Sequence, residues 1–235
     1  MFEVNVKLEC DSDGIKLFTM SNCHTIFFDV KFPSEFFAEY ECVEPTQIGL
    51  HIPPLLTRIT GSKKGDTLTM ECSSDTISFS KRFKDKTTDF WIKQMTIEDE
   101  ALNVPSLKED VTIRMKSAYA TEWLKEVLTG VTSNLKLTPM KNKLLLSSVG
   151  DLAGVNHYQN IPAADIEYIN YSAPRPVQLG NKHLTTIFKE IPKLSDEMEL
   201  GYKNDMPFTI RATRESLSFR IFMAPMHLDE EMDDE

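Results

Sequence analysis

The chain has 235 residues, 41% hydrophobic and 26% charged, with a formal net charge of −10. This is the composition of a globular protein of one large domain or two ordinary ones. It contains no apolar run of the roughly 20 residues that cross a bilayer, and its first residues show no basic and apolar signal. Neither a membrane protein nor a secreted protein is therefore expected.

The acidic charge is concentrated at the C-terminus. Six acidic residues lie within 229–235, and the rest of the chain carries −4. Such a run predicts a solvated tail, and a moderately acidic body still allows a basic face toward nucleic acid. The cysteines, at positions 10, 23, 42 and 72, include no CxxC pair. We therefore expect reduced thiols, with no disulfide framework, no metal site and no cofactor.

Hydrophobic periodicity predicts a helix and two strands between residues 53 and 79. Pro53 and Pro54 suit the opening of the helix, and Gly61 suits its end. From 67 to 72 apolar and polar residues alternate, which predicts a half-buried strand, and a second strand is predicted around 77–79.

The second half of the chain begins with a predicted strand over 111–115 and a helix from about Ser117 to Leu128, whose apolar stripe includes Trp123. A later helix carries apolar residues at 184, 187, 188 and 191, and Pro192 is expected to end it. Strand patterns follow around 198–202 and 217–221.

The two halves repeat one plan. Apolar positions 198, 200 and 202 lie 130 residues after positions 68, 70 and 72. A period of this size predicts two similar domains, because solenoid repeats run to only about 20–50 residues. The strand and helix of 111–128 have no counterpart in the first half. The predicted boundaries are 1–95 for an N-terminal domain, 96–110 for an acidic connector, 111–228 for a C-terminal domain and 229–235 for the tail.

Catalytic motifs are absent from the sequence. The five histidines are scattered and form no HExxH pattern, and there is no GxSxG, GxxxxGK[ST] or GxGxxG motif. We expect no enzyme and no catalytic residue. A nucleic-acid-processing hydrolase that depends on His24 or His157 is the remaining enzyme hypothesis.

Four short segments, in order along the chain, resemble one known family. They are Met20–His24 with Ser34–Cys42, then Glu100–Pro105, Pro176–Leu179 and Phe222–Pro225 before the acidic tail. The chain resembles the proliferating cell nuclear antigen (PCNA) family of DNA sliding clamps. Relative to that family, roughly 20 residues are missing from the first domain, about one strand and one helix in length. Either the element is lost, or the given start lies downstream of the native one.

The resemblance implies an α+β DNA clamp fold, with two similar domains that each have antiparallel sheets and helices on one face. Three chains would form a pseudo-six-fold ring, a homotrimer, around duplex DNA without reading its sequence. The implied function is that of a nuclear processivity factor for DNA replication and repair, opened by a clamp loader ATPase. The alternative is a clamp-like partner-binding protein that does not form a closed ring.

The resemblance also implies an apolar pocket for the PIP-box motif of partners such as replicative DNA polymerase, flap endonuclease and DNA ligase. Without the resemblance, Met20, Phe27 and Phe222 are better explained as core residues of a β-rich protein. The implied pocket residues are Met20, His24, Phe27, Leu102, Val104, Pro105, Pro207, Phe222, Ala224 and Pro225.

Basic residues on or near the predicted helices are implied to face DNA phosphates. An ordinary mixed-charge helix surface is the alternative. These residues are Arg58, Lys63, Lys64, Lys125, Lys182, His183 and Lys189.

Two edge strands are implied to join neighbouring subunits, which would pair otherwise exposed backbone groups. Their implied interface residues are Phe90, Trp91, Ile92, Leu152, Val155 and His157. Lys141 falls where the family carries its modified lysine, so it is a candidate for ubiquitin or SUMO attachment.

Overall fold

The computed structural model describes residues 5–21, 23–96, 107–128, 134–140, 142–149, 154–168, 176–204 and 206–226. The chain divides into two compact units. Unit 1 comprises residues 1–24 and 29–103, and unit 2 comprises residues 25–28 and 104–235. The division after residue 103 falls inside the predicted connector, most of which lies outside the described residues. In the described part of the chain, no helix has both the length and the apolar character needed to cross a membrane.

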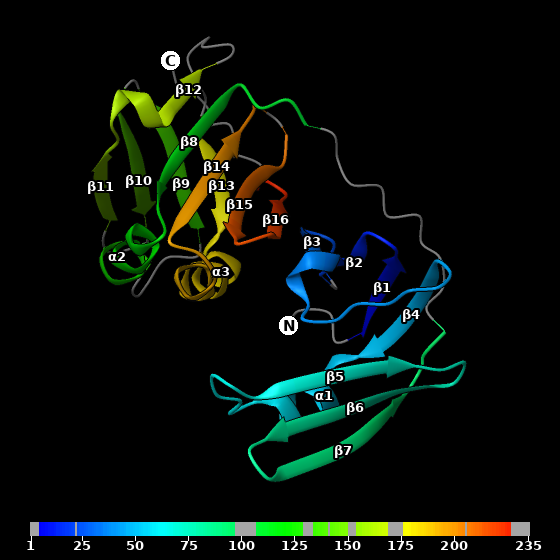
Figure 1. The fold of residues 1–235 in the computed structure, drawn as a ribbon. Coiled ribbons are helices and arrows are strands. Elements are labelled where there is room, and N and C mark those ends of the chain that lie inside the picture. The colour runs from blue at the N-terminus through cyan, green and yellow to red at the C-terminus, as the bar shows by residue number, and fades with distance from the viewer. Residues whose placement is uncertain are drawn as a thin grey trace, which may run out of the picture. The chain divides into compact units, whose positions relative to one another are not determined.

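Unit 1 contains two antiparallel sheets joined by one helix (Figure 1). The first sheet has the order β3-β2-β1-β4 and the second the order β5-β6-β7. The first sheet consists of β1 (Asn5–Asp11), β2 (Gly14–Met20), β3 (Ile26–Pro33) and β4 (Thr46–His51), with a 3-10 turn at Ser34–Phe36. Helix α1 (Ile52–Ile59) leads to β5 (Thr67–Cys72), β6 (Thr76–Phe83) and β7 (Lys86–Lys93).

The core of unit 1 lies between these two sheets. Val6 lies opposite Leu50 in the β1–β4 register, and both are buried. From the other sheet, the rings of Phe79 and Phe90 stack with centroids 5.0 Å apart, and both belong to the same buried cluster. Because alternate residues of a strand face opposite sides, one face of each sheet supplies this core.

Unit 2 repeats this plan with additional elements. Its sheets have the orders β12-β8-β14-β15-β16 and β11-β10-β9-β13, and residues 25–28 at the start of β3 lie next to β16. The strands are β8 (Val111–Lys116), β9 (Asn134–Met140), β10 (Lys143–Val149), β11 (Gly154–Asn160), β12 (Ile166–Tyr168), β13 (Val177–Gly180), β14 (Glu197–Tyr202), β15 (Phe208–Arg214) and β16 (Leu217–Met223). The helices are α2 (Ala118–Glu126), α3 (Asn181–Leu194) and a 3-10 turn at Ala163–Asp165.

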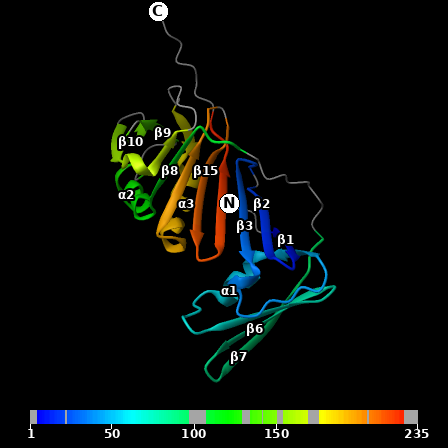
Figure 2. The same ribbon diagram turned by 45° about the horizontal axis from the view of Figure 1, so that its top comes forward.

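Helices α2 and α3 lie side by side in both ribbon views (Figures 1 and 2). Trp123 of α2 meets Phe188 of α3 with ring centroids 5.5 Å apart, and both side chains are fully buried. The helix predicted to stop at Pro192 continues to Leu194. The prediction was wrong because the proline occupies the last turn, where the Ser195 N–H still donates to the Ile191 carbonyl at 3.0 Å.

The correspondence between the units extends to single hydrogen bonds. In unit 1, the N–H of Met95, just after β7, donates to the Gly49 carbonyl of β4 at 3.0 Å. In unit 2, the N–H of Met226, just after β16, donates to the Gln178 carbonyl of β13 at 2.8 Å. Each unit is therefore closed by the same cross-link between its two sheets.

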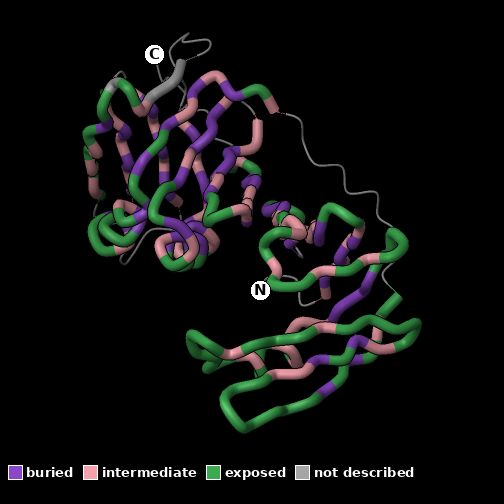
Figure 3. Tube along the Cα trace, viewed as in Figure 1, coloured by how far each residue is buried: buried purple, intermediate pink, exposed green. Residues whose placement is uncertain are grey.

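Three elements of unit 2, namely β8, α2 and β12, have no counterpart among the described residues of unit 1. The consequence is visible on β5, which was predicted to be half-buried. Its Leu68 is 46% exposed, and most of the strand is exposed (Figure 3). The equivalent residues of β14, Met198 and Leu200, are buried. The half-buried prediction was wrong because β8 and α2, which complete the structure around β14, have no equivalent beside β5 among the residues that the structure describes.

The turn between β1 and β2 is held by a distant tyrosine. Gly14 has φ +137°, and a Cβ at this position would collide with the Phe32 carbonyl, so the turn requires glycine. The hydroxyl of Tyr40 lies 2.8 Å from the carbonyl oxygens of both Asp11 and Gly14. Burial raises the pKa of Tyr40 above its usual value, which keeps the hydroxyl protonated as a donor.

Replacing Tyr40 with phenylalanine should lower the free energy of unfolding by about 1–2 kcal/mol, because the two carbonyls lose the single O–H that they share. Urea titration followed by circular dichroism measures this. The control is Tyr158→Phe, whose side chain is exposed and should change stability by less than about 0.5 kcal/mol. Equal effects of the two variants would contradict a bridging role for Tyr40.

Candidate functional site

The exposed face of α3 carries a row of polar and basic residues. Lys182, Thr186, Lys189 and Lys193 follow one another at helical spacing and are all exposed. Lys193 was not among the predicted DNA-facing residues, because the helix was expected to stop at Pro192. Its Nζ lies 2.8 Å from a Glu190 carboxylate oxygen, so part of its charge is neutralised locally.

The remaining predicted DNA-facing residues of unit 2 differ in character. His183 is half-buried, and burial, together with the charge of Lys182, lowers its pKa below the usual value. His183 is therefore neutral at physiological pH and adds no positive charge to the helix face. Lys125 is exposed on α2 between Glu122 and Glu126.

In unit 1, the predicted basic residues extend from α1 into the loop that precedes β5. Arg58 is exposed, and its guanidinium carbon lies 5.4 Å from the centroid of the Phe90 ring. Lys63 and Lys64 are exposed, and the backbone N–H of Lys63 donates to Asp66 Oδ2 at 3.1 Å. The side chains of both lysines thus remain available on the surface of the loop.

The predicted apolar pocket is divided between the two units. In unit 2, Phe27 and Phe222 are buried against each other, with ring centroids 5.9 Å apart. They pack as core residues, which is the alternative that the sequence left open. The exposed residue Ala224 donates its N–H to the Thr25 carbonyl at 2.8 Å. Pro207 and Pro225 are partly exposed.

Unit 1 contributes a turn to the predicted pocket. His24 is exposed and has φ +55°, and its N–H donates to the Ser21 carbonyl at 2.7 Å. Its Nδ1 lies 3.2 Å from Met20 Sδ, so the two predicted residues are in contact. The connector residues Leu102, Val104 and Pro105 lie outside the described residues.

The two predicted interface segments are edge strands of their sheets, β7 in unit 1 and β11 in unit 2. On β7, Trp91 is 65% exposed, whereas Phe90 and Ile92 face the core and are buried. On β11, Val155 and His157 are partly exposed, and His157 Nδ1 lies 2.8 Å from Glu126 Oε2. Leu152 and Lys141 lie outside the described residues.

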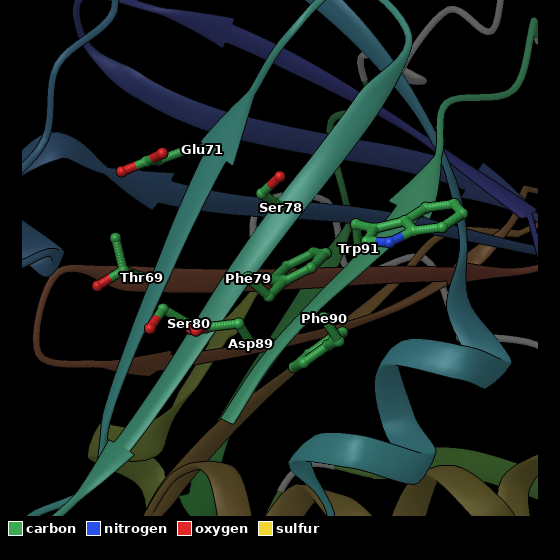
Figure 4. A pocket seen from close by; sticks show the side chains of 8 residues that line it. All are labelled: Thr69, Glu71, Ser78, Phe79, Ser80, Asp89, Phe90 and Trp91. Carbon is green, nitrogen blue, oxygen red and sulfur yellow. The ribbon is translucent and has the colours of Figure 1, made fainter. Parts of the chain in front are cut away.

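A shallow hollow of about 320 Å³ lies on the sheet β5-β6-β7 (Figure 4). The strand register aligns Thr69, Ser80 and Asp89 in one row, and Glu71, Ser78 and Trp91 in the next. By alternation, these residues face away from the stacked phenylalanines of the core. With two acids and no basic lining residue, the hollow does not suit a phosphate group.

No group of three or more histidine, cysteine, aspartate or glutamate side chains in the described ranges is arranged to hold a metal ion. Within residues 107–110, the described end of the acidic connector, Glu109 has a structural role. Glu109 is buried, and its Oε1 accepts hydrogen bonds from Thr209 Oγ1, at 2.8 Å, and from Arg211 Nη2. Arg211 also donates to Glu199 at 2.7 Å. Sequence reasoning had taken Glu109 as a solvated linker acid, and no local pattern distinguishes it.

Substituting Glu109 with alanine should lower the free energy of unfolding by about 3 kcal/mol, because the buried Thr209 hydroxyl would lose its acceptor and the partly buried Arg211 would lose one of its two carboxylate partners. Chemical denaturation measures the loss. Glu190→Ala removes the exposed ion pair to Lys193 and is the matched control, with an expected cost below about 1 kcal/mol. A cost for Glu109→Ala as small as that of the control would show that the buried pair does not anchor the connector.

Comparison with known proteins gives consistent matches. The model of the PCNA N-terminal domain matches residues 3–101. PCNA of Saccharomyces cerevisiae is 25% identical over 236 residues, covering 96% of this chain and 90% of the yeast protein. PCNA 2 of Plasmodium falciparum is 23% identical, with 88% and 81% covered. The crystal structure of Entamoeba histolytica PCNA superposes with a TM-score of 0.85 at 18% identity, covering 96% of this chain and 91% of that one.

The matches and the antiparallel α+β architecture define the class of the protein as a DNA sliding clamp, or processivity factor, which is not an enzyme. The predicted fold class is confirmed. Within this class, the chain is similar to proliferating cell nuclear antigen over nearly its whole length, and its residues 3–101 match the N-terminal domain of that family.

Proposed function

We propose that the protein closes as a homotrimeric ring around duplex DNA in the nucleus and holds replication and repair proteins on the template. A clamp loader ATPase would open the ring. The helix lysines would contact phosphates without reading bases, and enclosure of the duplex rather than tight binding would retain the protein. A sparse basic lining is sufficient for such retention.

The observation that carries this proposal is the pairing partner of β16. Residues 25–28 of β3 lie beside β16. In the repeated plan, β7 is the counterpart of β16 and β11 is the counterpart of β3, since the sheet orders β3-β2-β1-β4 and β11-β10-β9-β13 match. Pairing of β7 in one chain with β11 in the next would repeat the bond between β16 and β3. Three chains related in this way would supply the six domains of a ring.

Retention on circular DNA tests ring closure. The wild-type protein, once loaded, should remain on closed circles and leave linear duplexes through their ends. Trp91→Lys adds a charge at the β7 edge, which opposes strand pairing, so it should sediment as a smaller species and lose retention on circles at least tenfold.

The matched control for this experiment is Val43→Lys. Val43 is exposed and lies on neither edge strand, so this variant should remain a trimer that is retained on circles. A wild-type monomer at micromolar concentration, or equal retention on circles and linear DNA, would contradict a closed ring.

The docking function is assigned to the apolar residues of the connector and the C-terminal segment. A PIP-box helix would place a few apolar side chains against them, as in helix-in-groove recognition. Two features support this assignment. The C-terminal segment is tied in place through Ala224 and Met226, and Leu102 and Val104 are apolar residues within an acidic stretch.

Changing Leu102 and Val104 to alanine should weaken binding of a PIP-box peptide by about 1–3 kcal/mol in total, because apolar contact area is lost. Fluorescence anisotropy measures the affinity, and Val43→Ala is the exposed apolar control. Unchanged affinity of the double variant would exclude the connector as the docking surface.

A clamp-like protein that binds partners without encircling DNA is the second candidate. It is favoured by the lack of a counterpart to β8 and α2 in the described part of unit 1, since a second helix there would add to the DNA-facing surface. Under this alternative, peptide binding would survive while retention on circles is absent, so the two experiments separate the candidates.

A further inference from the structure

One end of the sheet β5-β6-β7 carries a cluster of basic residues. The strand register places Thr67, the first residue of β5, opposite Arg82 near the end of β6. The loop of residues 60–66 and the turn between β6 and β7 therefore lie at the same end of the sheet (Figure 1). We call this the basic sheet end. Its basic residues are Lys63, Lys64, Lys81, Arg82, Lys84 and Lys86.

Most of the positive charge at the basic sheet end is not neutralised. Residues 60–67 and 81–87 contain six basic and two acidic residues, a net charge of +4 in a chain whose net charge is −10. Asp66 pairs with Lys81 at 3.7 Å, and its Oδ2 accepts the backbone N–H of Lys63 at 3.1 Å. This aspartate thus ties the loop to β6. Among the described residues, the other five basic side chains form no ion pair with a carboxylate, and all five are exposed.

The equivalent end of unit 2 shows that the hairpin does not need these charges. The turn between β15 and β16 has two residues, as does the turn between β6 and β7. The first turn residue has a positive φ in both, +53° at Lys84 and +54° at Glu215. The corresponding residues of unit 2, 195–197 and 212–218, contain one basic and three acidic residues. The same backbone therefore carries a net charge of +4 in unit 1 and −2 in unit 2, so the fold does not require the cations.

The width of the basic sheet end suits an extended polyanion. Neighbouring strands lie about 4.8 Å apart, so the three strands span about 10 Å, and the long basic side chains reach further. Duplex DNA carries one negative charge per about 1.7 Å of helix axis, so a surface of this width faces several phosphates at once. Arg82 is held in the sheet between Thr67 and Thr87, which gives its side chain a fixed origin.

The chemistry favours phosphates over an acidic protein segment. Protein segments gain most of their affinity from apolar side chains that are buried in a pocket. Phe83 is the one aromatic residue of the basic sheet end, and the Lys84 ammonium lies 5.4 Å from the centroid of its ring. Exposed cations without fixed partners suit a ligand with repeated charges, because each contact releases counterions and none needs a particular geometry.

We propose that the basic sheet end binds the phosphates of duplex DNA, as a contact surface of unit 1 that is separate from the helix faces. The proposal rests on the proposed function for the choice of DNA as the polyanion. Helix α1 adds Arg58 of its last turn, and the chain then continues through Lys63 and Lys64 into the sheet. Arg82, Lys84 and Lys86 extend this surface along the end of the sheet.

Binding of the full-length protein to a short linear duplex tests the proposal, because it requires neither a clamp loader nor a closed ring. Fluorescence anisotropy with a labelled duplex of about 20 base pairs gives the association constant at several salt concentrations. The triple variant Arg82→Gln, Lys84→Gln, Lys86→Gln should bind about tenfold more weakly at low salt. The slope of log K against log salt should fall in magnitude by about 2–3, because each lost phosphate contact removes about 0.9.

The matched control is the triple variant Lys31→Gln, Lys93→Gln, Lys108→Gln, which removes three exposed positive charges elsewhere. Lys93 lies at the other end of β7, so the control also reports any effect on that edge strand. The control should keep the slope of the wild type. Circular dichroism and sedimentation check that both variants keep the fold and the oligomeric state of the wild type.

Three results would overturn the proposal: no salt-dependent binding of the wild type, an unchanged slope in the first variant, or equal losses in the two variants. A labelled peptide with the sequence of residues 229–235 that binds more tightly than the duplex at the same salt would also overturn it, in favour of an acidic protein segment. A protein that binds the short duplex as expected but is not retained on circles would contradict the closed ring alone. Retention on circles with an unchanged slope would contradict the basic sheet end alone.

Discussion

The hydrogen-bonding requirement of sheet edges is the constraint on which this structure depends. Each backbone N–H and C=O at an edge must find a partner in water or in another strand, and an exposed edge is a template for pairing. In unit 2, the strands β14-β15-β16 are paired on both sides, with β8 beside β14 and residues 25–28 beside β16. Unit 1 leaves β5 and β7 as edges. Among the described residues, the two copies of one plan therefore differ in which strand edges are paired.

Charge is used differently in the interior and on the helix surfaces. Arg211 and its two partners, Glu109 and Glu199, are largely removed from water. In such an environment, loss of one partner is costly because it leaves a charge without its counterion. The lysines of α3 remain in solvent, where each is screened by salt and fixed only weakly. The first arrangement holds the connector end against β15. The second suits loose, sequence-independent contact with a polyanion.

Much of the fold was accessible from the sequence because its signals are local. The 130-residue spacing of the apolar positions in β5 and β14 identified the repeat, and the apolar stripe around Trp123 identified α2. The exposure of Leu68 was not accessible, because it depends on a neighbouring element that the alternating pattern does not encode. Burial of Glu109 was also missed, since its partners Thr209 and Arg211 lie about 100 positions away in the chain.

For the candidate site, sequence reasoning identified residue types more reliably than their environments. Phe27 and Phe222, both assigned to the implied pocket, are in contact with each other, and their mutual burial depends on the pairing of β16 with the start of β3. Lys193 follows Lys182 and Lys189 at helical spacing, and it was overlooked because a proline in the last turn was read as a helix terminator. In both cases the outcome was decided by tertiary packing and by position within the element.

Gly201 packs closely against Glu109, the buried residue at the end of the connector, and this packing limits which substitutions can accumulate there. A Cβ on Gly201 would collide with the side chains of both Thr209 and Glu109. A larger residue at 201 thus requires that the side chains at both 109 and 209 shift or become shorter. Divergence at these three positions is expected to be correlated, and a relative that replaces both the glycine and Glu109 must secure the connector by other means.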